Sequence, residues 1–231
     1  GTLTGKVNIT SIGLIFLAAL GTESVGSVVS GTYLHTFTRN NTNTAPTLTL
    51  FRKTPDFVTK MAMCALKSLV IEVVTGEYVK YTAEFVGQLG VTTTQTIAYT
   101  DEIEFTSKYV TLKTASLVAG LAGATAISVK SAKITIEKEV EPFYSLGSVT
   151  PVEIHNKTFN VTVEVEKRHS DEAYKTLAFN NTSQAMELRL TNTDDLIGTA
   201  QSPDIVFTLA KTKITEWEAD QGLDDIAMES M

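Results

Sequence analysis

Two segments with alternating apolar and polar residues constrain the fold of this chain more than any other feature. They occupy residues 67–73 and 78–86 and flank the short segment Thr75, Gly76 and Glu77. Successive side chains of a β-strand point to opposite faces, so a period of two is typical of strands buried on one face. The sequence therefore predicts a long β-hairpin with a tight turn at Gly76.

One face of this hairpin is apolar and is expected to point into the core. Its members are Leu69, Ile71, Val73, Val79, Tyr81, Ala83 and Phe85. The opposite face carries polar side chains, which are Ser68, Glu72, Lys80, Thr82 and Glu84.

A second strand pair, residues 132–140 and 158–166, repeats this pattern with a longer connecting loop. The side chains expected in the core are Ile134, Ile136, Phe159, Val161, Val163 and Val165. Those expected on the polar face are Thr135, Glu137, Glu139, Thr162, Glu164 and Glu166. The chain also has 36 threonines, and β-branched residues favour strands, so the sequence predicts a mainly β fold.

Shorter elements are predicted between and around these pairs. Residues 102–106 and 109–113 indicate two short strands. Residues 11–20 indicate a short helix that begins at Ser11 and ends at Gly21. Residues 170–178 indicate a second helix, with Ser170 as its capping residue.

An internal similarity suggests a duplication. Residues 40–50 and 180–190 share six of eleven positions, and residues 65–72 resemble 209–216. We interpret residues 1–231 as one domain with an internal duplication, about 33–90 and 173–231. The alternative is chance agreement between two turn-plus-strand sequences.

Composition excludes several classes of function. The net charge of -7 argues against a protein that binds DNA by neutralising phosphates. A single cysteine, Cys64, excludes an internal disulfide framework. The apolar runs 12–20 and 115–127 are shorter than the roughly 20 residues that cross a bilayer, so no membrane segment is expected.

No motif for catalysis, for a cofactor or for a metal ion is found, so we predict a protein that is not an enzyme. The Gly-x-Ser-x-Gly sequence of many hydrolases is missing, and the glycines form no nucleotide-binding pattern. His35 is expected to be a partly buried strand residue. The acidic pairs Asp194–Asp195 and Asp224–Asp225 are expected to be exposed turn residues rather than cation ligands.

Taken in order, the short motifs resemble those of the major tail tube proteins of long-tailed bacteriophages with non-contractile tails. The motifs, in residue numbers, are 20–21, 35–37, 83–87, 105–106, 110–113, 131–136, 146–148 and 157–164. Met63, before Cys64, stands where this family more often has glycine.

The resemblance implies a β-sandwich or partly closed barrel with one or two short flanking helices. It also implies six copies in a ring, and rings that stack into a hollow tail tube through which DNA is ejected. The implied partners are further copies of the chain and the tape measure, tail terminator and baseplate proteins. The implied location is the tail of the virion, after assembly in the host cytoplasm. Long loops at 39–46, 90–100 and 115–127 are the candidate contacts between subunits.

Acidic residues on the polar faces of the two strand pairs give a hypothesis for the tube lumen. The candidates are Glu72, Glu84, Glu137, Glu139, Glu164 and Glu166, against two lysines, Lys80 and Lys133. An acidic lining would repel phosphates and let DNA slide. The alternative is an ordinary solvated sheet face.

A second hypothesis for the function comes from the glycosylation sequons. Six Asn-x-Ser/Thr sequences occur, at Asn8, Asn40, Asn156, Asn160, Asn180 and Asn181. They fit an extracellular β-sandwich adhesin or a surface-layer subunit, although a chain rich in Asn and Thr contains several by composition alone.

Overall fold

The computed structural model describes residues 1–220 and 227–231. The fold is mainly β, with short helices and with sheets in sandwich-like layers rather than a closed barrel. The predicted fold class is therefore confirmed, in its sandwich form.

The chain divides by its internal contacts into two compact units. Unit 1 comprises Gly1–Ile71, Lys80–Ile103 and Thr135–Thr162, and unit 2 comprises Glu72–Val79, Glu104–Ile134 and Val163–Met231. The predicted duplication remains a prediction: a strand precedes the first of the two similar segments, whereas a helix precedes the second.

The described strands, in chain order, are β1 (Thr2–Lys6), β2 (Gly21–Val25), β3 (His35–Arg39), β4 (Thr47–Lys53), β5 (Val58–Val74), β6 (Lys80–Val86), β7 (Val91–Thr93), β8 (Val110–Ala115), β9 (Val129–Phe143), β10 (Glu153–Arg168), β11 (Gln184–Thr191), β12 (Asp204–Thr212), β13 (Glu218–Asp220) and β14 (Met228–Ser230). The described helices are α1 (Ile12–Leu20), α2 (Ala173–Phe179) and the 3₁₀ turns η1 (Ser107–Tyr109) and η2 (Val118–Gly123).

Hydrogen bonds join these strands into one large sheet and two small ones. The large sheet has the order β1-β6-β5-β9-β10-β14-β13, and β4 and β7 also pair with β5. The small sheets have the orders β12-β11-β8 and β2-β3.

The two predicted strand pairs are confirmed as β5 with β6 and β9 with β10. Of the inward side chains predicted for the first pair, all are buried except Tyr81, which is half-buried. In the second pair Ile134, Ile136 and Val165 are buried, and the other three are half-buried. The alternation continues past these apolar residues to Lys138 and Lys167, which are therefore buried, with exposed fractions of 5% and 3%.

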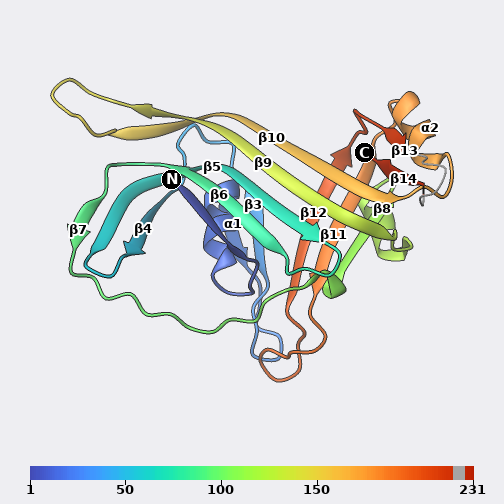
Figure 1. Ribbon diagram of the computed structural model, residues 1–231, viewed down its shortest axis with the longest axis horizontal. Helices are drawn as coiled ribbons and strands as arrows, with labels where there is room; N and C mark the ends of the chain where they lie inside the picture. Colours follow the sequence, from blue (N-terminus) through green and yellow to red (C-terminus); the bar gives the residue numbers. More distant parts are fainter. Residues whose placement is uncertain (221–226) are drawn as a thin grey trace. The chain divides into compact units, whose positions relative to one another are not determined.

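Helix α1 confirms the first predicted helix and packs on β3 in unit 1 (Figure 1). The rings of Phe16 and Phe37 meet edge to face, with centroids 5.8 Å apart. Gly21 ends the helix in the left-handed conformation, at a φ of 94°, which glycine adopts without steric cost. Ser11 is the N-cap residue, as predicted, but its side chain makes no capping hydrogen bond, and the Ile12 N–H donates to Asn8 Oδ1 at 3.1 Å instead.

Unit 2 contains the sheet in which β11 lies between β12 and β8, and its central side chains Leu188, Leu190 and Leu112 are buried. Helix α2 confirms the second predicted helix. Figure 1 shows it near β13, β14 and the C-terminus. Its predicted cap, Ser170, is wrong, because the Ala173 N–H donates to Asp171 Oδ1 at 2.9 Å.

Residues 102–106 do not form the predicted strand. Of the predicted strand 109–113, residues 110–113 are confirmed within β8, whereas Tyr109 ends the turn η1. Phe105 is nevertheless fully buried in unit 2, and its carbonyl accepts a hydrogen bond from the Val79 N–H at 2.8 Å. The apolar pattern therefore identified a buried side chain, but the backbone there makes only isolated bridges rather than a ladder.

Met63 has a φ of 49°, in the left-handed region that favours glycine. It lies within β5, next to the point where Gly87 approaches the strand. A Cβ added to Gly87 would lie 2.9 Å from Cys64 Cα. The preference for glycine before Cys64, stated above for the resembling family, thus has a conformational reason, and this chain places a methionine in the same backbone conformation.

Candidate functional site

In unit 2 the predicted lumen residues form ion pairs across β9 and β10. Lys133 Nζ lies 3.0 Å from Glu164 Oε1, and Lys130 Nζ lies 2.8 Å from Glu166 Oε1. The hydrogen bond from Lys130 lowers the pKa of Glu166 below its usual value. Glu72, on β5, is exposed and has no ion pair within the described residues.

In unit 1 the polar face carries the same kind of pair. Lys67 Nζ lies 3.3 Å from Glu84 Oε1. Lys157 Nζ lies 3.9 Å from Glu139 Oε1 and 2.7 Å from Glu141 Oε2, and its hydrogen bond lowers the pKa of Glu141. Glu137 is exposed, and among the described residues no ion pair to it is found.

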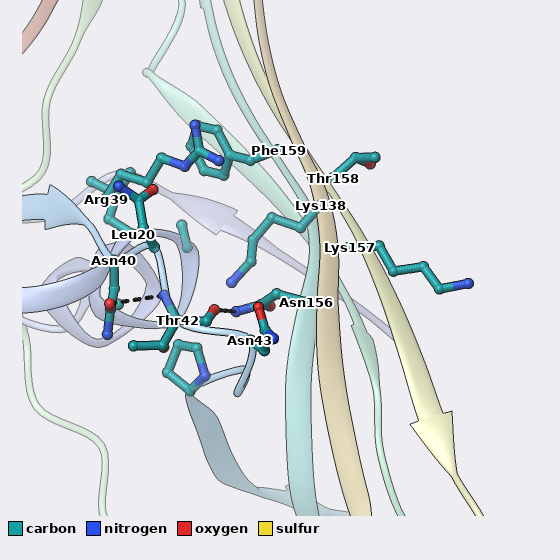
Figure 2. A pocket seen from close by; sticks show the side chains of 14 residues that line it. Leu20, Arg39, Asn40, Thr42, Asn43, Lys138, Asn156, Lys157, Thr158 and Phe159 are labelled. Atoms are coloured by element: carbon teal, nitrogen blue, oxygen red, sulfur yellow. Dashed lines mark hydrogen bonds between the residues drawn. The ribbon is translucent and has the colours of Figure 1, made fainter.

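These contacts change the charge expected for the candidate lumen residues. Four of the six glutamates lie within 4 Å of a lysine ammonium. Three of these lysines, Lys67, Lys130 and Lys157, are additional to the two that the sequence placed on the polar faces. Lys157 precedes the predicted strand 158–166, and the alternation of buried and exposed side chains along β10 is interrupted there, so the sequence pattern did not place it on the polar face. Figure 2 shows Lys157 pointing away from the side chains of Lys138 and Asn156. The polar faces therefore carry mixed charge rather than mostly acid.

Each of the three candidate contact loops contains a short strand or turn, or is hydrogen-bonded to a strand. Segment 39–46 is tied to β10 at Ala45, whose N–H donates to the Ile154 carbonyl at 3.1 Å. Segment 90–100 contains β7, which pairs with β5, and then the exposed Tyr99. Segment 115–127 contains η2, with Leu121 buried. Their role in contacts between subunits remains a prediction.

A cluster that the sequence analysis did not identify lies around Glu229 in unit 2. The Glu229 carboxylate has an exposed fraction of 0% and forms an ion pair with Lys167. It also accepts a hydrogen bond from Trp217 Nε1 at 3.0 Å and lies 3.4 Å from His169 Nδ1. Trp217 thus packs locally against this carboxylate. The cluster fastens the C-terminal strand β14 to β10.

The remaining polar candidates occupy ordinary structural positions. His35 is exposed rather than partly buried, which corrects the prediction, and its Nδ1 lies 2.6 Å from Glu23 Oε1. Asp194 and Asp195 are exposed turn residues as predicted, with both N–H groups donating to Asn192 Oδ1. Asp224 and Asp225 lie outside the described residues.

Within residues 1–220 and 227–231, no group of three or more His, Cys, Asp or Glu side chains is placed to hold a metal ion. In the same part of the chain no helix combines the length and the apolar character needed to span a bilayer.

Long antiparallel strands with cross-strand ion pairs and an exposed polar face are features of a β-sheet with one solvated face. The model of the phage tail tube protein family matches residues 1–222, so the chain belongs to this family of structural virion proteins. The resemblance to phage tail tube proteins is thereby confirmed at the level of this family. A comparison with curated proteins found no match.

Proposed function

We propose that six copies of this chain form a ring and that the rings stack into the tail tube of a long-tailed phage, through which DNA is ejected into the host. The family match over residues 1–222 carries this proposal. It also favours the tail tube over the alternative of an extracellular adhesin. The proposed partners are the tape measure, tail terminator and baseplate proteins, with assembly in the host cytoplasm before incorporation into the virion.

A free strand edge in unit 2 supports ring formation. Among the described residues β12 pairs only with β11, so its other edge offers backbone hydrogen-bonding groups to a neighbouring copy. The nine residues of β12 include no proline, and their side chains alternate between exposed and half-buried over most of the strand. An open edge of this kind suits a head-to-tail interface that closes into a ring.

An apolar hairpin tip supports stacking. In unit 1 the β9–β10 hairpin reaches beyond the ends of β5 and β6 (Figure 1). Its tip exposes five large apolar side chains, which are Phe143, Tyr144, Leu146, Val149 and Val152. Apolar groups gathered at an exposed tip favour contact with another protein surface. We add this tip to the three loops already proposed as contacts between subunits.

Electron microscopy of the purified full chain tests the proposal. We expect rings with sixfold symmetry, or tubes built from them, in negatively stained samples at increasing protein concentration. Analytical ultracentrifugation of the same samples gives the assembled fraction. A chain that stays a single copy under all these conditions contradicts the proposed assembly and returns the adhesin hypothesis to consideration.

Charge reversal tests the proposed lumen. The structure suggests Glu72→Lys with Glu137→Lys, because these two candidates have no lysine partner among the described residues. We expect tubes to assemble but DNA ejection to slow, since added lysines would hold phosphates through counterion release. The control is Glu153→Lys, which reverses an exposed charge outside the candidate set. Ejection at the wild-type rate in the double variant, measured on phage particles by dye release, would remove the lumen assignment.

A further inference from the structure

A polar pocket in unit 1 lies between the end of helix α1, segment 39–46 and strands β9 and β10 (Figure 2). Its volume is about 160 Å³, enough for the end of a polar side chain and its backbone amide. The lining residues, all of them described, include Arg39, Lys138 and Lys157 and no aspartate or glutamate. The charged residues that line the pocket are therefore all basic, although the chain has a net charge of -7.

Lys138 supplies a buried positive charge to this pocket. Its exposed fraction is 5%, and Figure 2 shows its side chain pointing into the space enclosed by the labelled residues. Nζ donates to the Ala18 carbonyl at 3.0 Å, near the C-terminal end of α1 where the helix dipole favours a cation. That contact uses one of three donors, and no carboxylate of the described residues forms an ion pair with Lys138. Burial lowers its pKa, so an added anion would stabilise its charged form.

Arg39 places a second cation at the same pocket. Its guanidinium lies over the Phe159 ring, 4.7 Å from the centroid, and this contact holds the side chain at the pocket wall. Within the described residues no ion pair to Arg39 is found. Arg39 and Lys138 thus leave several N–H donors for oxygen atoms of a bound group.

Asn156 presents a hydrogen-bond acceptor to the pocket, whereas Lys138 and Arg39 present donors. Its Nδ2 donates to the carbonyls of Thr42 and Thr44, at 3.3 and 3.1 Å. Its Oδ1 is buried and has no hydrogen-bond partner among the described residues. A buried acceptor without a partner destabilises the folded chain, so a ligand that offers an N–H or O–H here would remove that penalty.

We propose that the pocket receives an acidic segment of a second copy of this chain, whose carboxylate accepts hydrogen bonds from Lys138 and Arg39 and whose backbone N–H donates to Asn156 Oδ1. An occupant must offer acceptors to Lys138 and Arg39 and a donor to Asn156, and this combination distinguishes an acidic peptide segment from other ligands. A DNA phosphate diester or a free acetate ion offers acceptors only, whereas a peptide with an acidic side chain offers both. The chain itself has 26 acidic residues against 19 basic ones. The inference rests on the proposed tube assembly and assigns one contact within it.

Two lysine variants test the pocket. Lys138→Met removes the buried charge, and Lys157→Met is the matched control, because Lys157 also borders the pocket but points to the opposite face and pairs with Glu141 (Figure 2). We expect Lys138→Met to raise the concentration for half-assembly at least about tenfold and Lys157→Met to leave it within about twofold. Circular dichroism and thermal unfolding establish that each variant folds. Equal assembly of Lys138→Met and wild type overturns the inference.

Cross-linking of the wild-type chain provides a test that no folding defect can affect. Assembled particles made from equal parts of ¹⁵N-labelled and unlabelled chain are treated with a zero-length carbodiimide, which joins an ammonium to a carboxylate in contact with it. We expect peptides in which Lys138 of one isotope is joined to an aspartate or glutamate of the other. Links from Lys138 only within one isotope, or none while Lys157 links to Glu141, contradict an occupant from a second copy.

A third measurement separates this inference from the proposed function. If the wild-type chain does not assemble, the tube proposal fails, yet the pocket can still be probed on the single copy by NMR. N-acetylglutamate methylamide carries both a carboxylate and amide N–H groups. It is expected to shift the Asn156 side-chain amide in wild type but not in Lys138→Met, and to do so more than sodium acetate or inorganic phosphate. An equal response to acetate or phosphate indicates a general anion site, and a stronger response to an oligonucleotide indicates DNA; either result overturns the proposed occupant.

Discussion

Replacing Glu229 by glutamine is expected to lower the free energy of unfolding of unit 2 by about 3–5 kcal/mol, the cost of breaking a buried ion pair. Glu229 and Lys167 are register partners on β14 and β10, and both side chains are nearly inaccessible. Glutamine has the same shape but no charge, so the Lys167 ammonium would remain buried without a counter-ion. Urea unfolding followed by Trp217 fluorescence measures this directly, because Trp217 Nε1 donates to the same carboxylate.

Hydrogen exchange locates the effect. The Val165 N–H donates to the Met231 carbonyl at 2.8 Å, and the Met231 N–H donates to the Val165 carbonyl at 3.0 Å. Both amides are expected to exchange faster in Glu229→Gln, since they depend on the attachment of β14 to β10. Unchanged protection of both amides would show that the carboxylate does not hold the C-terminal strand.

The same pair makes the stability of unit 2 depend on acidity. Burial by itself would raise the pKa of Glu229, but hydrogen bonds from Lys167, Trp217 and His169 outweigh it and hold the pKa below the usual 4.5. A carboxylate with a lowered pKa in the folded state stabilises that state above the pKa of the unfolded chain, and the contribution is lost as the pH falls through the folded-state value. The difference between wild type and Glu229→Gln should therefore be largest near neutral pH and shrink below about pH 4.5.

Glu164→Gln is the matched control for this prediction. It removes an exposed glutamate, with a side-chain exposed fraction of 65%, from a similar cross-strand pair with Lys133. Exposed pairs of this kind contribute about 0–1 kcal/mol, because water and salt screen them. Equal losses in Glu164→Gln and Glu229→Gln would contradict the assignment of the large effect to burial.

Replacing Phe105 by alanine is expected to cost about 3–5 kcal/mol, because it leaves a cavity where a fully buried ring had been. For a chain of this length each kcal/mol lowers the melting temperature by about 2–4 °C, so the expected decrease is about 6–20 °C. Differential scanning calorimetry measures it and also shows whether the two units melt together.

The control for Phe105 is Phe179→Ala on helix α2, where 77% of the side chain is already exposed. This change removes the same ring without opening a cavity, and a decrease of no more than about 2 °C is expected. A Phe105→Ala variant that melts within 2 °C of wild type would show that the surrounding side chains close the cavity, or that residue 105 is not a core position.

Local sequence patterns predicted the strands of this protein well because successive side chains of a strand alternate between a buried and an exposed face. Leu69, Ile71 and Val73 lie on one face wherever the neighbouring strands are placed, and the structure buries all three. Helix α1 was predicted for a related reason, since its apolar run and Gly21 are both local signals. The order of short motifs also identified the family, and the family model confirms it.

Partners that are distant in the sequence could not be predicted in this way. Lys138 and Lys167 read as solvent-exposed by residue type, but they continue the inward parity of β9 and β10. Burial of Lys138 is stabilised by the hydrogen bond from its ammonium to the carbonyl of Ala18, 120 residues earlier in the chain. Burial of Lys167 is stabilised by its ion pair with the Glu229 carboxylate. The charge of the polar faces was likewise misjudged, since the lysines that pair with Glu84 and Glu139 lie on neighbouring strands.

The sequence by itself therefore determined the long strands, the side chains that they bury and the tail tube family, because these depend on period, turn residues and motif order. Only the tertiary structure decided which charges are paired, which lysines are buried and where Lys138, which has no carboxylate partner among the described residues, faces a pocket. Each of these depends on groups that the fold brings within a few ångströms from distant positions in the chain. Hydrogen bonds form only at such distances, and the Coulomb energy of an ion pair is largest there.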